Sequence, residues 1–324
     1  MRAVFQTGYG SPDAFEIREV EKPAIRKADD VLVRVHAAAL HAGDVFMMRG
    51  VPYFTRMVVG FPKPRGYVPG YDAAGRVEAV GADVTRFRPG DEVFGSFAHT
   101  CAEYACASED KLERIPSNLT LEQAAAVPTS AIAALVGIRD AGKVQPGQKV
   151  LINGASGGVG TFAVQIAKAY GAEVTGVCST KNADLVRSIG ADHVIDYTKE
   201  DFIQGTDRYD VILDNVANHS LAACRRVLTP TGKHIPNSGH SGMPYILKAM
   251  LVSMFVRQQG STYVATPKPG DLIELKDLIE TGKATPVIDR TYALDEFTEA
   301  MRYLNEGHAR GKVVIAVARP TDSG

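Results

Sequence analysis

A run of small residues near the middle of the chain has the composition of a loop that holds a phosphate group. It comprises Gly154, Ala155, Ser156, Gly157, Gly158, Val159 and Gly160. Glycines in such a run allow a tight turn, a close approach of the backbone to a pyrophosphate, and close packing of a helix on a strand. A helix that starts there adds free N–H groups and the positive end of its dipole. The run predicts a dinucleotide site where a strand precedes it and a helix follows.

The end of the second strand after this loop favours one dinucleotide over the other. A site for NAD usually has an acid there to hold the ribose 2′-hydroxyl. Here Ser179, Thr180 and Lys181 follow the strand, and the first acid is Asp184, inside a predicted helix. Two hydroxyls and an ammonium suit the 2′-phosphate of NADPH. Alternatively, Ser179 only caps that helix and Lys181 is a solvated surface charge.

The segments around the loop have the periodicity that such a site requires. Residues 149–153 form an apolar run typical of a buried strand. From 159 to 170 apolar residues recur at the spacing of a helix with one buried face, and Gly171 then suits a left-handed cap. Further strands are predicted over 174–177, 193–195 and 211–213, and further helices over 183–189 and about 220–228. This alternation predicts a doubly wound parallel sheet.

The rest of the chain has a different pattern of apolar and polar residues. Short alternating runs such as Val31–His36 and Gly75–Val80, separated by turns such as Arg88–Asp91, predict a small β-barrel or sandwich in the first 120 residues. After residue 267 the pattern predicts a helix over 272–280, a strand over 285–290, a helix over 294–305 and a strand over 312–317. A chain of 324 residues should form two domains rather than one.

The bulk composition excludes several classes of function. Hydrophobic residues make up 45% of the chain and charged residues 23%, as in a globular protein. The formal net charge of −1 suggests neither a nucleic-acid nor an anionic-membrane partner. We expect no signal peptide and no membrane insertion, because the longest apolar stretch is too short to span a bilayer. The four cysteines are scattered without metal-type pairing, which predicts reduced thiols in a cytoplasmic protein.

Several motifs together resemble the medium-chain dehydrogenase/reductase superfamily. They are residues 145–160, residues 190–197, and the stretches 69–81 and 89–93 of the amino-terminal part. The resemblance implies an α/β fold in which a GroES-like β-barrel catalytic domain (1–120) precedes a Rossmann dinucleotide-binding domain with a doubly wound parallel sheet (121–266). It also implies that residues 267–324 return to the catalytic domain and that the active site lies between the domains.

The zinc ligands of the superfamily's alcohol dehydrogenases are largely absent. Those enzymes have Cys where His41 stands, a His-Glu pair at Tyr71 and Asp72, and a third ligand near Thr129. No Cys or His occurs from Ala107 to Val177. His41 and Asp72 could supply two of the three protein ligands that catalytic zinc needs. We therefore expect no metal, and the chain resembles the zinc-independent quinone oxidoreductases and 2-alkenal reductases.

This branch implies roles for further residues. The resemblance places Ser179, Thr180, Lys181 and Tyr197 around the adenosine phosphate, and Asn215 with Asn237 and Ser238 near the nicotinamide. Asp44 matches an acidic residue of the branch. The best side-chain donors in the amino-terminal half are His41, Tyr53 and Tyr71, although each could equally be a packed core or rim residue. We expect Asp44 to orient a neighbour or to bond the cofactor rather than to transfer a proton.

The chemistry predicted from these residues is hydride transfer from NADPH to a small apolar electrophile, a quinone or an α,β-unsaturated carbonyl. Such acceptors are activated by conjugation and need only positioning and a weak hydrogen bond to the developing oxyanion. Two alternatives stay open: a zinc-dependent alcohol dehydrogenase with unusual ligands, and an NADPH-binding scaffold or sensor without turnover. Residues 50–63 and 243–259 should shape the acceptor pocket, and a homo-oligomer is expected from the branch.

Overall fold

The computed structural model of the chain describes residues 1–237, 268 and 270–318. Its contacts divide the chain into two compact units. Unit 1 contains residues 1–129, 267–280 and 286–324, and unit 2 contains residues 130–266 and 281–285. Ser238 and the segment 243–259, for which sequence predictions were made, lie outside the described residues.

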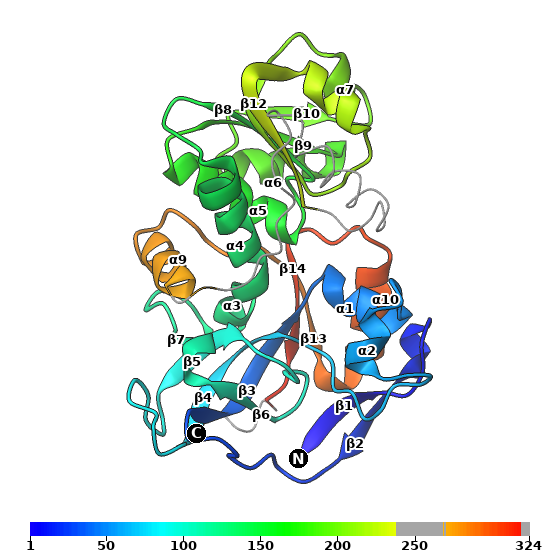
Figure 1. Ribbon diagram of the computed structural model, residues 1–324, viewed down its shortest axis with the longest axis vertical. Coiled ribbons are helices and arrows are strands. Elements are labelled where there is room, and N and C mark those ends of the chain that lie inside the picture. The colour runs from blue at the N-terminus through cyan, green and yellow to red at the C-terminus, as the bar shows by residue number, and fades with distance from the viewer. Residues whose placement is uncertain (238–267, 269, 319–324) are drawn as a thin grey trace. The chain divides into compact units, whose positions relative to one another are not determined.

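Unit 2 is built on a five-stranded parallel sheet in the order β10-β9-β8-β11-β12 (Figure 1). The strands are β8 (Lys149–Asn153), β9 (Glu173–Cys178), β10 (His193–Asp196), β11 (Tyr209–Asp214) and β12 (Leu228–Pro236). The helices are α5 (Gly158–Ala169), α6 (Ala183–Ser188) and α7 (Leu221–Arg226), with a π-helix over Val136–Gly142 and 3-10 turns at Thr180–Asn182 and Phe202–Gln204. The order reverses between β8 and β11, so the doubly wound sheet is confirmed and its ligand crevice is expected at the carboxyl ends of these strands.

Helix α5 follows the sequence prediction closely. It begins one residue before the predicted start and ends at Ala169, and Gly171 has a φ of +81°. Phe162, Ala163 and Ile166 on its inner face are fully buried. Helix α7 is shorter than predicted because Ser220 caps it by accepting a hydrogen bond from the Ala223 N–H at 3.2 Å, and Leu228 already begins β12.

Unit 1 contains a seven-stranded, mostly antiparallel sheet and a two-stranded sheet. Its strands are β1 (Arg2–Gln6), β2 (Phe15–Glu19), β3 (Asp30–Leu40), β4 (Asp72–Val80), β5 (Glu92–Ser96), β6 (Tyr104–Ser108), β7 (Leu112–Arg114), β13 (Ile288–Ala293) and β14 (Lys312–Ala316). Its helices are α1 (Ala42–Arg49), α2 (Thr55–Val59), α3 (Leu121–Ala125), α9 (Asp271–Glu280) and α10 (Phe297–Asn305), with 3-10 turns at Pro12–Ala14, Glu109–Lys111 and Leu294–Glu296. Helix α4 (Pro128–Leu135) begins in unit 1 and continues in unit 2.

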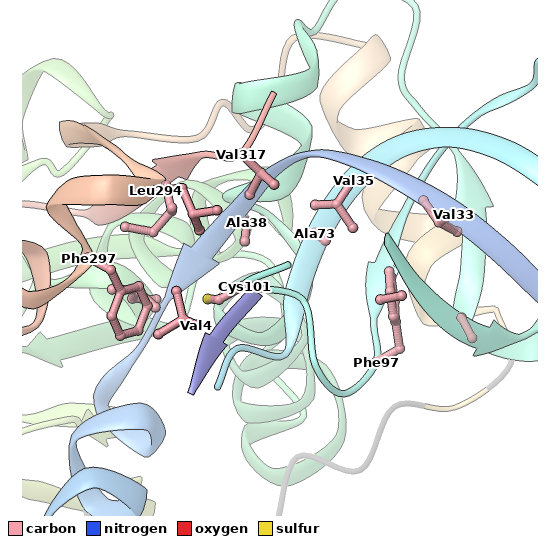
Figure 2. Close-up of a cluster of buried hydrophobic side chains, with 14 of the residues drawn as sticks. Val4, Val33, Val35, Ala38, Ala73, Phe97, Cys101, Leu294, Phe297 and Val317 are labelled. Atoms are coloured by element: carbon pink, nitrogen blue, oxygen red, sulfur yellow. The ribbon is translucent and has the colours of Figure 1, made fainter. Parts of the chain in front are cut away.

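The two runs chosen from the sequence lie in β3 and β4, which pair antiparallel. The last strand, β14, adds to β3 on its other side, with Val314 opposite Ala39. Side chains from these strands and from α10 meet in one core, in which Val33, Ala73 and Phe297 are buried (Figure 2). The last described strand thus forms part of the same sheet as the amino-terminal strands.

One predicted strand lies about three residues too early. Residues 285–290 were expected as a strand, but β13 covers Ile288–Ala293. Thr285 is held instead by the side chain of Gln165 in unit 2, which accepts from the Thr285 N–H at 2.8 Å and donates to its carbonyl at 3.0 Å. Pro286 then has no N–H for a ladder. The strand can begin only beyond these two residues.

The glycine loop predicts a contrast between two substitutions. A Cβ on Gly160 would lie 2.0 Å from the carbonyl oxygen of Gly154, whereas a Cβ on Gly157 meets only that oxygen, at 3.5 Å. We expect Gly160→Ala to lower the free energy of unfolding by about 1–3 kcal/mol through overpacking, although alanine favours a helix. Gly157→Ala should leave it within about 1 kcal/mol. Urea unfolding of both variants measures this, and equal stabilities would contradict the packing role of Gly160.

Candidate functional site

The glycine loop of unit 2 has the form of a nucleotide cradle. It turns sharply at Gly154, whose φ of +77° suits a residue without a Cβ. Gly157 is the N-cap of α5 and gives the helix no side-chain cap, so the first N–H groups of the helix keep no partner within it. A Cβ at Gly157 would make only an ordinary van der Waals contact, 3.5 Å from the Gly154 carbonyl oxygen, so the backbone there is little covered and can come close to a phosphate. The residues present therefore fit a dinucleotide.

A buried asparagine that the sequence analysis did not select connects this loop to the end of β9. Asn182 donates from Nδ2 to Ser156 Oγ at 3.0 Å and is 7% exposed. Its Oδ1 has no hydrogen-bond partner within the described part of the chain. An orphaned buried acceptor beside the loop is what a bound ligand with a hydroxyl or an N–H would satisfy. The only signal in the sequence was its position after Lys181.

The residues predicted for the adenosine phosphate do lie at the carboxyl ends of β9 and β10. Ser179 is buried, whereas Thr180 and Lys181 are exposed. Tyr197 is 58% exposed, and its N–H donates to the Cys178 carbonyl at 3.0 Å. These residues thus gather around one corner of the sheet, as expected for a site at the strand ends.

The same corner holds an acid that the sequence analysis missed. Asp196, the last residue of β10, accepts hydrogen bonds from the hydroxyls of Thr180 and Thr198. These bonds, Thr180 first, hold the pKa of Asp196 well below its usual range, so it is ionised at neutral pH. Lys199 lies 3.3 Å away and compensates its charge. Because Lys199 pairs with Asp196, Lys181 remains the basic residue of the 179–181 turn that could meet a phosphate.

At the carboxyl ends of β8, β11 and β12, asparagine residues link the strands by hydrogen bonds. Asn215 donates from Nδ2 to the Asn153 carbonyl at 3.1 Å and accepts from Asn237 Nδ2 at 2.7 Å. The two residues predicted for the nicotinamide side are thus brought together. Asp214, which precedes them, is fully buried and accepts from the N–H groups of Val216 and Ala217. It fixes the turn that carries Asn215.

Asp214 also belongs to a buried group with ligand chemistry. Its carboxylate, Cys224 Sγ and a ring nitrogen of His234 lie within 4.8 Å of one another. Burial and the nearby Asp214 raise the pKa of Cys224 to about 12, so it remains a thiol, which is a poor metal ligand. Asp214 is already engaged by His234 at 3.1 Å and by backbone N–H groups. We assign this group a structural role.

In unit 1 the candidate catalytic residue His41 is the N-cap of α1. Its Nδ1 accepts a hydrogen bond from the Gly43 N–H at 2.9 Å. A ring nitrogen that accepts carries no hydrogen, so in the neutral imidazole the hydrogen is on Nε2. A Cβ on Gly43 would lie 2.4 Å from the His41 ring, so glycine is needed for the ring to lie over the helix start. The capping bond therefore leaves Nε2–H as a donor.

Asp44 completes the cap. Its Oδ2 accepts from the His41 N–H at 2.9 Å, and its Oδ1 accepts from the Gly70 N–H at 3.3 Å. The side chain is 2% exposed. Asp44 thus has the geometry of a residue that orients its neighbour His41 and ties α1 to the segment before Tyr71.

Tyr71 lies next to His41, with ring centroids 5.9 Å apart. Its hydroxyl accepts from Tyr67 at 3.2 Å, so the Tyr71 hydroxyl hydrogen is directed elsewhere. Burial, the bond to Tyr71 and the charge of Asp44 raise the pKa of Tyr67, which stays protonated. Tyr67 was not selected from the sequence. Nothing there distinguished it from other tyrosines.

Tyr53, the third predicted donor, stands apart. Its ring is 73% exposed and packs against the Arg56 guanidinium, 4.8 Å from the ring centroid. His41 and Tyr71 are therefore the donors that the fold brings together.

At the positions of the superfamily's zinc ligands, this chain has a buried ion pair. Asp72 is completely buried, and Lys312 Nζ, itself 1% exposed, lies 3.2 Å from its Oδ2. Asp72 Oδ1 accepts from the Thr129 N–H at 3.0 Å and from the Thr129 hydroxyl. One oxygen of Asp72 is thus bound by Thr129, and the other oxygen lies beside the ammonium of Lys312. This set of groups does not fit a tetrahedral zinc site.

Comparison with known proteins gives two family models and many relatives. Residues 27–167 match the alcohol dehydrogenase GroES-like domain, and residues 189–315 match a model described as zinc-binding dehydrogenase. The 2-methylene-furan-3-one reductase of Solanum lycopersicum is 34% identical over 97% of this chain and 79% of its own length. The chloroplastic NADPH-dependent alkenal/one oxidoreductase of Arabidopsis thaliana is 33% identical with the same coverage.

A solved structure is also similar to this chain. The quinone oxidoreductase of Coxiella burnetii superimposes with a TM-score of 0.89 at 28% identity, and the match covers 98% of this chain and 99% of that one. No helix in the described part of this chain is both long enough and apolar enough to cross a membrane.

The buried ion pair leads to a stability prediction. Lys312→Met leaves Asp72 as an uncompensated buried charge and should lower the free energy of unfolding by about 3–5 kcal/mol. Adding Asp72→Asn removes that charge and should recover part of the loss. Lys22→Met removes an exposed ion pair with Glu78 and should change it by at most about 1 kcal/mol. Urea unfolding compares the free energies of unfolding of the three variants. Equal losses for Lys312→Met and Lys22→Met would contradict the cost assigned to the uncompensated buried charge.

The phosphate corner leads to a binding prediction. Lys181→Ala should weaken NADPH binding about tenfold or more, because an ammonium–phosphate contact is lost, and should leave NADH binding nearly unchanged. Lys199→Ala is the matched control, since Lys199 is paired with Asp196. Fluorescence titration with both nucleotides measures the effect. A similar loss for NADPH and NADH would refute the assignment of Lys181 to the 2′-phosphate.

Proposed function

Because this chain belongs to the medium-chain dehydrogenase/reductase superfamily, among its quinone oxidoreductases and enone reductases, we propose that it reduces a quinone or an α,β-unsaturated carbonyl compound with NADPH. The observation that carries the proposal is the His41 cap, which presents an Nε2–H donor beside the Tyr71 hydroxyl. Bound NADPH supplies the hydride. The cradle at Gly157 and the turn around Lys181 hold the nucleotide.

The chain's own residues then need only position the acceptor and stabilise the charge that develops on it. When a conjugated carbonyl accepts a hydride at carbon, negative charge develops on its oxygen. A neutral imidazole N–H or a phenol hydroxyl stabilises that oxygen by a hydrogen bond without moving a charge into the site. Since the Gly43 N–H fixes the His41 tautomer before any substrate binds, this donor is preorganised. Tyr53 is left out of the proposed donors because its ring is largely exposed.

We propose that turnover needs no zinc. The support is the donor set: Asp72 is neutralised by Lys312, and the Thr129 hydroxyl donates to Asp72 rather than facing a cation. Without a Lewis acid, simple alcohols should not be oxidised, because only conjugated acceptors are activated by themselves. The zinc-dependent alternative keeps one argument, the description of the family model for residues 189–315. A cytoplasmic location and a homo-oligomeric state remain predictions.

The metal question has a direct test. Activity with NADPH and a panel of quinones and enones should survive extended chelation, and the active protein should contain far less than stoichiometric zinc. Aliphatic alcohols with NADP should give essentially no turnover. Stoichiometric zinc with chelator-sensitive alcohol oxidation would restore the dehydrogenase alternative. NADPH binding without turnover on any acceptor would favour the sensor.

The role of His41 has a matched pair of variants. His41→Ser keeps an N-cap acceptor but loses the outward donor, so the protein should fold and lose about 10–100-fold in kcat. His41→Asn keeps both a cap and an amide N–H, so it should retain more activity. Steady-state kinetics with one enone measures this. An unchanged kcat in a folded His41→Ser protein would remove His41 from the mechanism.

A further inference from the structure

Within the described residues, the large exposed apolar side chains are concentrated in one short segment, part of the stretch 50–63 that was expected from the sequence to shape the acceptor pocket. Of the nine large hydrophobic side chains that are exposed among the described residues, six lie between residues 51 and 61. They form what we call the apolar patch: Val51, Tyr53, Phe54, Met57, Val58 and Phe61. Scattered exposed hydrophobic residues are normal, but a contiguous group marks a surface that contacts something other than water.

The local fold explains why these side chains point outward. Thr55 and Val59, one helical turn apart on α2, are buried, and α2 packs on α1. Met57, on the opposite side of the helix from both, is 86% exposed. Phe61 follows the end of α2 and is 66% exposed. The packing of α2 through Thr55 and Val59 therefore holds Met57 outward, and the other patch residues flank this packed helix.

The charges around the patch identify its partner. From Val45 to Tyr71 the chain has four basic residues (Arg49, Arg56, Lys63 and Arg65) and no acidic residue. The hydrogen bonds of the three arginines go to the amide of Asn305 and to the backbone carbonyls of Gly50 and Phe61. Since these acceptors are uncharged, the segment remains strongly cationic although the whole chain has a formal net charge of −1.

We propose that the apolar patch docks this protein on the surface of an anionic lipid bilayer. Aromatic and aliphatic side chains set among lysine and arginine are suited to the boundary between acyl chains and headgroups. The basic residues then meet the negative headgroups. The inference does not depend on the proposed function, but it gives that function a location where apolar acceptors partition.

Vesicle sedimentation of the full chain tests this, and the assay contains no NADPH or acceptor, so its outcome is separate from that of any activity assay. We expect the protein to sediment with vesicles of equal parts phosphatidylcholine and phosphatidylserine. Binding to phosphatidylcholine alone should be about tenfold weaker or less, and high salt should release the protein. Failure to sediment with the anionic vesicles would overturn the proposal.

Two pairs of variants locate the surface. Met57→Asp should reduce partitioning to anionic vesicles about tenfold or more, whereas Ile273→Asp, at an exposed apolar residue of α9, should behave as wild type. Lys63→Glu should reduce it about fivefold or more, whereas Lys283→Glu, at an exposed lysine of unit 2, should not. Equal effects within a pair would contradict the assignment. A dimer in sedimentation velocity that Met57→Asp dissolves would assign the patch to a second copy of the chain and overturn it as well.

Discussion

An ion pair with almost no access to water holds unit 1 together. Lys312 and Asp72 are 1% and 0% exposed, and 240 residues of chain separate them. Removing two such charges from water is costly, and the cost is offset only because both oxygens of Asp72 have partners. Through Thr129 the same carboxylate fixes the start of α4. The strands β4 and β14, and the entry to α4, all depend on this one carboxylate.

This pair also changes what the surrounding groups can do. In a zinc dehydrogenase a cation at these positions would act on a substrate oxygen. Here the cation is an ammonium that is already engaged with a carboxylate, so the positive charge is neutralised inside the protein. The polar chemistry is left to neutral donors. His41 illustrates how closely this is tied to folding, because the hydrogen bond that caps α1 is the one that sets the His41 tautomer.

Features that depend on neighbouring residues could be predicted from the sequence. The glycine loop, the strand before it and the inner face of α5 follow from local periodicity, and the position of Gly171 follows from its freedom to adopt positive φ. Features that join distant segments could not. Lys312 carries no local signal, since its partner Asp72 is known only once β14 and β4 are in place. Likewise, Thr180 meets Asp196 only once β9 and β10 are in register. Strand β13 was misplaced for the same reason: Gln165, far away in sequence, holds Thr285.

The division of the chain has a consequence for the order of events during synthesis. Unit 2 is inserted in unit 1, whose last strand comes from residues 312–316. While the ribosome is still making that strand, β3 has an unpaired edge and Asp72 lacks its ammonium. All five described strands of the parallel sheet have by then emerged and can pair. The inserted half is thus able to mature first, and the amino-terminal half, although made earlier, must wait until residues 312–316 have been made to close its sheet.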